Sequence, residues 1–127
     1  MRILGPKEDL ASLYGEARVF VAPTRYAAGI PHKAHEAAAH GIPMVVSPLL
    51  ASQLGWSAGK ECLVAGTPLE FAKACTELYT DESLWTRLRE QALERVRLEL
   101  NPEAFGQTVR RLLAGLAMRR SSAFSAD

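Results

Sequence analysis

The sequence has no long hydrophobic run and little excess charge of either sign. Of its 127 residues, 15 are basic and 14 acidic, and a formal net charge of +1 provides no bulk field for attracting nucleic acid or a membrane surface. No apolar run approaches the roughly 18 residues that a membrane span requires. The first ten residues also lack the hydrophobic segment of a signal peptide. We therefore expect a cytoplasmic protein with no nucleic-acid partner and no membrane span.

Cysteine is also scarce, with only Cys62 and Cys75 in the chain. Their spacing does not fit a metal-ligand pattern, and two thiols are too few for a disulfide scaffold. We expect both to be buried free thiols in a reducing compartment. The length and the 48% hydrophobic content suit one globular domain with a core of useful size.

Short apolar runs alternate with segments of helical spacing. Continuous apolar runs predict strands that are buried on both faces, as in a parallel sheet. Such runs occupy 19–22, 44–47 and 62–65, with a strand stub at 1–4. Helices are expected at 7–16, 31–40, within 49–59, after residue 67, after residue 81 and over about 102–118. The pattern predicts an α/β layer architecture with a small parallel sheet flanked by helices.

Several residues mark where the helices begin and end. Thr67 followed three residues later by Glu70 is a capping box, and Asp81 and Asn101 are expected N-caps. Gly41 fits the left-handed residue that follows a helix. The expected domain covers 1–118, and 119–127 is expected to be a disordered tail.

The sheet is small for its helices, because only three strands are well supported. Such a sheet exposes its edges. We therefore expect self-association through an exposed sheet edge, helped by the apolar side of the last helix, which carries Phe105, Val109, Leu112, Leu113 and Leu116.

The loop after the strand at 19–22 is the best candidate for a ligand site. In sheets of this kind, ligands bind outside the carboxyl ends of the strands. Thr24 and Arg25 lie there, and Gly29 lets a ligand approach the backbone closely. The start of the next helix offers N–H groups and a positive dipole end to a phosphate. The N–H groups expected to take part belong to Ile30, His32 and Lys33, since Pro31 has none.

Two side chains of that helix complete the candidate site. Lys33 adds a positive charge, and the Glu36 carboxylate suits the paired hydroxyls of a ribose or sugar. The alternative is that both are simply solvated on the helix surface. A metal site is not expected, because His35 and His40 are five residues apart and point to different helix faces. His32, Glu36 and His40 do share a face, but over two turns.

Four stretches of the sequence, 9–23, 29–33, 36–37 and 41–46, carry a resemblance to a known family. Together they resemble the group 1 family of retaining, nucleotide-sugar-dependent glycosyltransferases of GT-B architecture. The resemblance continues more weakly through 62–72 and the helix from Asp81, and covers about 5–113. It implies a Rossmann-like three-layer fold that corresponds to the second part of the C-terminal, donor-binding domain. The N-terminal acceptor domain and the first donor-domain strands, which carry basic residues for the diphosphate, are then missing, so we expect a truncated protein.

The resemblance also implies roles for individual residues. Glu36 matches the glutamate that holds the nucleotide ribose, and Gly29 matches the glycine of the same motif. Residues 30–33 match the backbone that holds the diphosphate and sugar, with Pro31 in place of a glycine. Ala28 stands where the family has a glutamate that contacts the donor sugar. A related subgroup has Gly-Ile-x-x-Lys here and also lacks that glutamate.

The implied reaction transfers a sugar from a nucleotide diphosphate sugar to an acceptor hydroxyl with retention. No cofactor and no catalytic residue are assigned, and the chain alone is expected to be inactive. The full-length protein is expected to be cytoplasmic or membrane-peripheral. Two alternatives stay open. One is a non-catalytic nucleotide-binding or protein-interaction module with a degenerate glycosyltransferase fold, and the other is a fragment of an ordinary α/β response-type protein or hydrolase.

Overall fold

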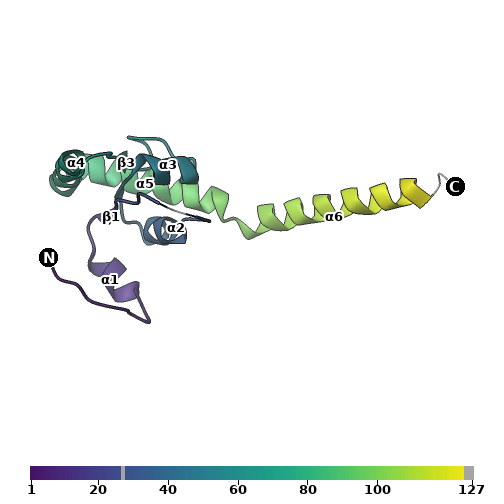
Figure 1. Ribbon diagram of the computed structural model, residues 1–127, viewed down its shortest axis with the longest axis horizontal. Helices are drawn as coiled ribbons and strands as arrows, with labels where there is room; N and C mark the ends of the chain where they lie inside the picture. Colours follow the sequence, from purple (N-terminus) through teal and green to yellow (C-terminus); the bar gives the residue numbers. More distant parts are fainter. Residues whose placement is uncertain (27, 125–127) are drawn as a thin grey trace. The chain divides into compact units, whose positions relative to one another are not determined.

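The computed structural model describes residues 1–26 and 28–124, with side chains described as far as Met118. Contacts divide the chain into two compact units, Met1–Val96 and Arg97–Asp127, and each is described by itself. The elements can be followed along the chain in Figure 1. They are α1 (Ala11–Glu16), β1 (Phe20–Ala22), α2 (His32–Ala39), β2 (Met44–Val46), α3 (Pro48–Leu54), β3 (Leu63–Val64), α4 (Pro68–Thr80), α5 (Glu82–Glu99) and α6 (Pro102–Phe124).

The three strands form one parallel sheet in the order β1-β2-β3. Phe20 pairs with Met44, and Val45 pairs with Leu63. Parallel strands need crossover connections, and helices α2 and α3 supply them. The predicted α/β fold with a small parallel sheet is therefore confirmed.

The central strand β2 is fully buried and divides the core into two clusters. Met44 and Val46 pack into one cluster with side chains of α2 and α3, and Val45 packs into the other with Leu78 of α4. Successive side chains of a strand point to opposite faces, so the sheet lies between two helical layers. Helix α5 contributes to both clusters, through Leu84 and Leu88 on one side and Ala92 and Val96 on the other.

The expectation that the first strand is buried on both faces was wrong. Val21, in the middle of β1, is 45% exposed, whereas Met44 and Val45 of β2 are fully buried. Strand β1 is an edge of this three-stranded sheet, so only one of its sides has a hydrogen-bonding neighbour. An unbroken apolar run therefore indicated a strand without showing whether it is central.

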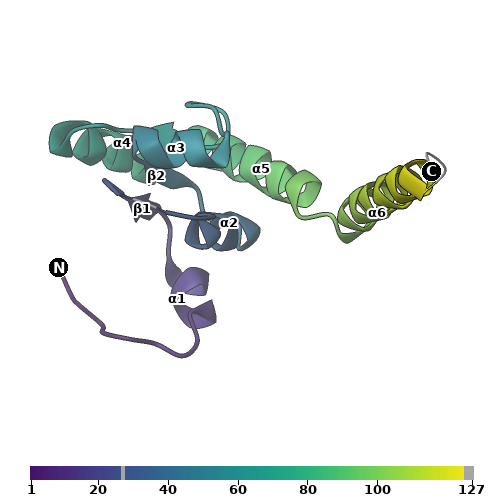
Figure 2. The ribbon, with the colours of Figure 1, turned by 45° about the vertical axis from the view of Figure 1, so that its right-hand side comes forward.

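The expectations for the N-terminus were also wrong. Residues 1–4 form no strand, and Ile3 is 83% exposed, because the described residues offer the segment no neighbouring strand. The first helix begins at Ala11 rather than at Lys7, with the Asp9 carboxylate accepting a hydrogen bond of 2.9 Å from the Ala11 N–H. Both views show α1 beside α2 (Figures 1 and 2).

The predicted helix caps are confirmed. Thr67 Oγ accepts from the Glu70 N–H while the Glu70 carboxylate accepts from the Thr67 N–H, which completes the capping box. Asp81 accepts from the Leu84 N–H, and Asn101 accepts from the Glu103 N–H. Gly41 has the expected left-handed backbone, with φ at 72°.

A cluster of cationic and aromatic side chains fastens the strand β1 segment to α5. The Trp85 indole N–H donates to the Arg18 carbonyl at 2.8 Å, and the Arg18 guanidinium lies 5.5 Å from the centre of the indole ring. Arg89 lies 5.8 Å from the same ring and donates to the Gly41 carbonyl at 3.2 Å. Contacts of this kind contribute about 0.5–2 kcal/mol each.

Helix α6 belongs to the second unit and is longer than predicted. It runs to Phe124 rather than to residue 118, so the expected tail overlaps it over 119–124, and 125–127 lie outside the described residues. Its apolar side chains are exposed, with Phe105 at 73%. Among the described residues, no helix combines the length and the hydropathy needed to cross a bilayer. Of the two free cysteines, Cys62 is buried and Cys75 is half-buried.

Candidate functional site

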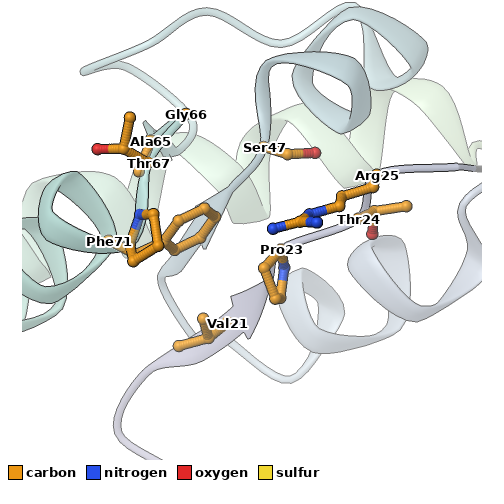
Figure 3. Close-up of a pocket in the computed structure, with 10 residues that line it drawn as sticks. Val21, Pro23, Thr24, Arg25, Ser47, Ala65, Gly66, Thr67 and Phe71 are labelled. Atoms are coloured by element: carbon orange, nitrogen blue, oxygen red, sulfur yellow. The ribbon is translucent and has the colours of Figure 1, made fainter.

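A pocket of about 360 Å³ opens at the carboxyl ends of the three strands (Figure 3). Residues from all three strand ends and from the first turn of α4 form its wall. They are Val21, Pro23, Thr24, Arg25, Ser47, Ala65, Gly66, Thr67, Pro68 and Phe71. This is where open parallel sheets bind their ligands, and the volume lies within the usual range for small-molecule sites.

The sheet itself brings these residues together. Thr24 and Arg25 follow β1, Ser47 follows β2, and Gly66 and Thr67 follow β3. Hydrogen bonds join the three strand ends, because the Ser47 N–H donates to the Ala22 carbonyl and the Ala65 N–H donates to the Val46 carbonyl. The pocket floor is therefore built from hydrogen-bonded strand ends.

The pocket combines an apolar wall with a few polar groups. Figure 3 shows the Arg25 guanidinium and the Phe71 ring reaching toward each other from opposite sides. Ser47 and Thr67 are helix N-caps whose hydroxyl oxygens accept from N–H groups of α3 and α4. Each hydroxyl keeps its own proton, which it can donate to a ligand.

The start of α2 forms a second candidate surface on the same loop. Gly29 has φ of 93°, a conformation that favours glycine, and an added Cβ there would meet nothing within 4 Å. Pro31 is the N-cap and supplies no side-chain cap. The His32 N–H donates to the Ile30 carbonyl at 2.9 Å, so this N–H group already has a partner within the loop. Ile30 and Lys33 are exposed.

Glu36 lies on the exposed side of α2, where it faces α1 rather than the pocket. The pKa of Tyr14 on α1 is raised by burial and, to a lesser degree, by the charge of Glu36 and a hydrogen bond to it. The Tyr14 ring also stacks on the His40 ring with 4.7 Å between centroids. Glu36 and His40, the C-cap of α2, are one helical turn apart, and both contact Tyr14 of α1. The three side chains therefore form one cluster.

The structure thus divides the predicted site residues between two surfaces. Thr24 and Arg25 line the pocket, whereas the segment 29–33 and Glu36 do not. The pocket's far wall, formed by Ser47, Gly66, Thr67 and Phe71, was not predicted from the sequence. Most of this wall could have been predicted from the strand pattern. The residues that directly follow the predicted parallel strands must all lie at the same edge of the sheet.

The histidines considered for a metal site have other neighbours. His40 stacks on Tyr14, and the His35 ring meets the Trp56 ring edge-on at 5.8 Å. Within residues 1–26 and 28–124, no three His, Cys, Asp or Glu side chains are grouped so that they could hold a metal ion.

Comparisons with known proteins agree on one family. A family model described as "Glycosyl transferases group 1" matches residues 1–81, more than half of the chain. Among solved structures, the chain is similar to sucrose-phosphate synthase from Thermosynechococcus elongatus, with 29% sequence identity and a TM-score of 0.66. The match covers 84% of this chain but only 28% of that one. No curated protein matches the chain significantly. The predicted fold, part of a GT-B glycosyltransferase, is confirmed.

Proposed function

Because the chain belongs to the group 1 glycosyl transferases, we propose that it is a nucleotide-sugar-binding part of such an enzyme. The single observation that carries the proposal is the family match over residues 1–81, which includes the whole loop from β1 to α2. The reaction is transfer of a sugar from a nucleotide diphosphate sugar to an acceptor hydroxyl, with retention at the anomeric carbon.

The proposed donor runs along the loop and the first turns of α2. Glu36 is exposed and holds the ribose hydroxyls with its carboxylate, which keeps free lone pairs beside Tyr14. The segment from Gly29 to Lys33 holds the diphosphate at the positive end of the α2 dipole. The glycosyl group then lies toward Thr24 and Arg25. The leaving group is a diphosphate, so stabilising its developing charge is the main chemical task of the segment from Gly29 to Lys33.

The remaining parts of the enzyme are proposed to lie outside this chain. An acceptor domain binds the acceptor, and the first strands of the donor domain supply the basic residues that complete the diphosphate site, so the chain alone is inactive. The exposed edge of β1 is the surface through which copies of the chain associate when those parts are missing. The two free cysteines suit a reducing compartment such as the cytoplasm.

Calorimetric titration of the 127-residue chain tests the proposal. Uridine, adenosine and guanosine diphosphate are titrated into the wild type and into Glu36→Gln. We expect one of them to bind and Glu36→Gln to weaken it about tenfold or more, because charged hydrogen bonds are lost. Glu90→Gln is the matched control, since Glu90 is an exposed glutamate on α5. The proposal fails if none of the three binds, or if the two variants behave alike.

A second candidate is a binding module that kept the fold without catalysis. It is favoured by Ala28, which stands where the resemblance places a sugar-contacting glutamate. Mixing the chain with the separately expressed remainder of the enzyme, which is the acceptor domain with the first donor-domain strands, separates the two when wild-type Ala28 is compared with Ala28→Glu. Sugar transfer with wild-type Ala28 supports the enzyme, and transfer only with Ala28→Glu supports the non-catalytic module.

A further inference from the structure

Charge is distributed unevenly around the pocket at the strand ends. Arg25 is the one charged side chain among the lining residues, and no aspartate or glutamate is among them. Within the described part of the chain, no carboxylate pairs with the Arg25 guanidinium. A pocket with one unpaired cation is complementary to an anionic ligand.

The Glu70 carboxylate, whose sequence neighbours line the pocket, already has hydrogen-bond partners. Glu70 accepts hydrogen bonds from the N–H groups of Gly66 and Thr67, so it neutralises the start of α4. Its ordinary role as a helix cap explains its position fully. The Arg25 charge is left for a ligand.

The rest of the pocket is shaped for a small ring with an apolar face. Phe71 of α4 forms one wall, Pro23 lies below Arg25 on the other side, and Val21 lies beneath them (Figure 3). Pro68 of α4 also lines the pocket. An aromatic ring provides a large apolar contact area at little cost in side-chain entropy. The Ser47 and Thr67 hydroxyls stand at the same ends of the strands and suit ring hydroxyls. The cavity volume of about 360 Å³ is enough for a sugar ring.

We propose that this pocket receives the glycosyl group of the donor and selects an acidic sugar, whose carboxylate pairs with Arg25. The inference rests on the proposed function and names its substrate class. Arg25 and Thr24 precede the segment 29–33 on the same loop, so a donor whose diphosphate lies on that segment presents its sugar toward the pocket. Ala28, between them, adds no carboxylate that would repel an acidic sugar.

The test compares acidic and neutral sugars at equal nucleotide. Uridine diphosphate glucuronate and uridine diphosphate glucose are titrated into the wild-type chain by calorimetry, or the pair on whichever nucleoside diphosphate binds. We expect the acidic donor to bind about tenfold more tightly or better, as bidentate arginine–carboxylate pairs allow. Arg25→Gln should abolish that ratio while leaving the affinity for the free nucleoside diphosphate unchanged. Arg111→Gln, an exposed arginine of α6, is the control for loss of one positive charge.

Two further measurements distinguish this inference from the proposed function. Phe71→Leu should weaken both donors about equally, because the ring contacts the sugar and not its charge. Free D-glucuronate and D-glucose are titrated by NMR, with Arg25-dependent shifts expected only for glucuronate. The inference is overturned if the two donors bind equally, if Arg25→Gln preserves their ratio, or if glucuronate does not bind in any form. Failure of all nucleoside diphosphates to bind overturns the proposed function, while glucuronate binding through Arg25 would still support the acidic pocket.

Discussion

Two helices begin at the same edge of the sheet, and they begin in opposite ways. Helix α4 is closed by its own side chains, because Thr67 and Glu70 satisfy each other's N–H groups and Glu70 also accepts from Gly66. Helix α2 follows Pro31, an N-cap without a side-chain hydrogen bond, after a loop with a left-handed Gly29. Backbone carbonyls are the partners here, because the His32 N–H donates to the Ile30 carbonyl and the Ala34 N–H donates to the Pro31 carbonyl. The start of α4 is therefore closed by side chains, whereas the start of α2 is open in the sense that no side chain caps it.

The largest loss of stability is expected when the core beneath helix α2 is weakened. Met44 is fully buried on the face of β2 that packs against α2, so Met44→Ala leaves a cavity and should lower the free energy of unfolding by about 2–5 kcal/mol. Urea denaturation followed by circular dichroism measures this. Val21→Ala on the exposed edge is the control, with an expected loss of less than about 0.5 kcal/mol. Equal losses would mean that the edge and the centre of the sheet do not differ.

The same core can be weakened by pH without mutation. Burial, with a smaller contribution from Glu61, raises the pKa of Cys62 from 9.0 to about 11. The folded state disfavours the Cys62 thiolate and keeps the neutral thiol. The contribution of Cys62 to the free energy of unfolding is therefore fully present below pH 9. It falls as the pH rises toward 11, by roughly 2–3 kcal/mol in total. Denaturation of the wild type and Cys62→Val across this range should show the steeper loss in the wild type. Cys75→Ala, which keeps Cys62, should follow the wild type closely.

Breaking the closed helix start should have an intermediate effect. Thr67→Ala removes the oxygen that accepts from the Glu70 N–H and should cost about 1 kcal/mol of stability, within a usual range of about 0.5–2. Thr67→Ser keeps the hydroxyl and should cost much less. If alanine and serine proved equally harmful, the capping box would not be what stabilises this start. Thermal unfolding of the three proteins is sufficient to decide.

Adding a side-chain cap to the start of α2 is expected to change stability least. It is also the sharpest test of the comparison between the two helix starts. Pro31→Ser supplies a cap, but it also loses the rigidity of proline, so the net change should stay within about 0.5 kcal/mol. Pro31→Ala loses the rigidity alone and should be about 1 kcal/mol less stable than Pro31→Ser. Pro31→Ser should also bind the nucleoside diphosphate more weakly, because its hydroxyl competes for the same N–H groups. Unchanged affinity would show that this helix start does not bind the diphosphate.

The features predicted well from the sequence depend on near neighbours in the chain. The capping box at Thr67, the caps at Asp81 and Asn101 and the stop at Gly41 each involve residues a few positions apart. Their chemistry is complete within one turn. The alternation of apolar runs with helices was likewise enough to give the parallel sheet.

The features predicted poorly depend on which segments meet in space. The exposure of Val21 follows from the place of β1 at the edge of the sheet, which no property of its own sequence reveals. Ile3 and Leu4 look like a strand but have no strand beside them in the described residues. The wall of the pocket joins Arg25 to Phe71, which lie far apart in the sequence and meet only because β1 and β3 end at the same edge of the sheet, on either side of β2. The orientation of Glu36 toward Tyr14 also needed the packing of α1 on α2.

The contact between Trp85 and Arg18 gives the chain a built-in optical reporter. The chain has two tryptophans, and Trp56 is almost completely buried in the core while the Trp85 indole N–H is bonded to the backbone just before β1. Trp56→Phe therefore leaves a single tryptophan, at the junction of β1 and α5, which can be excited selectively. Its emission wavelength follows the docking of the strand that carries the pocket loop, and it can be read in the same cuvette in which a ligand is titrated.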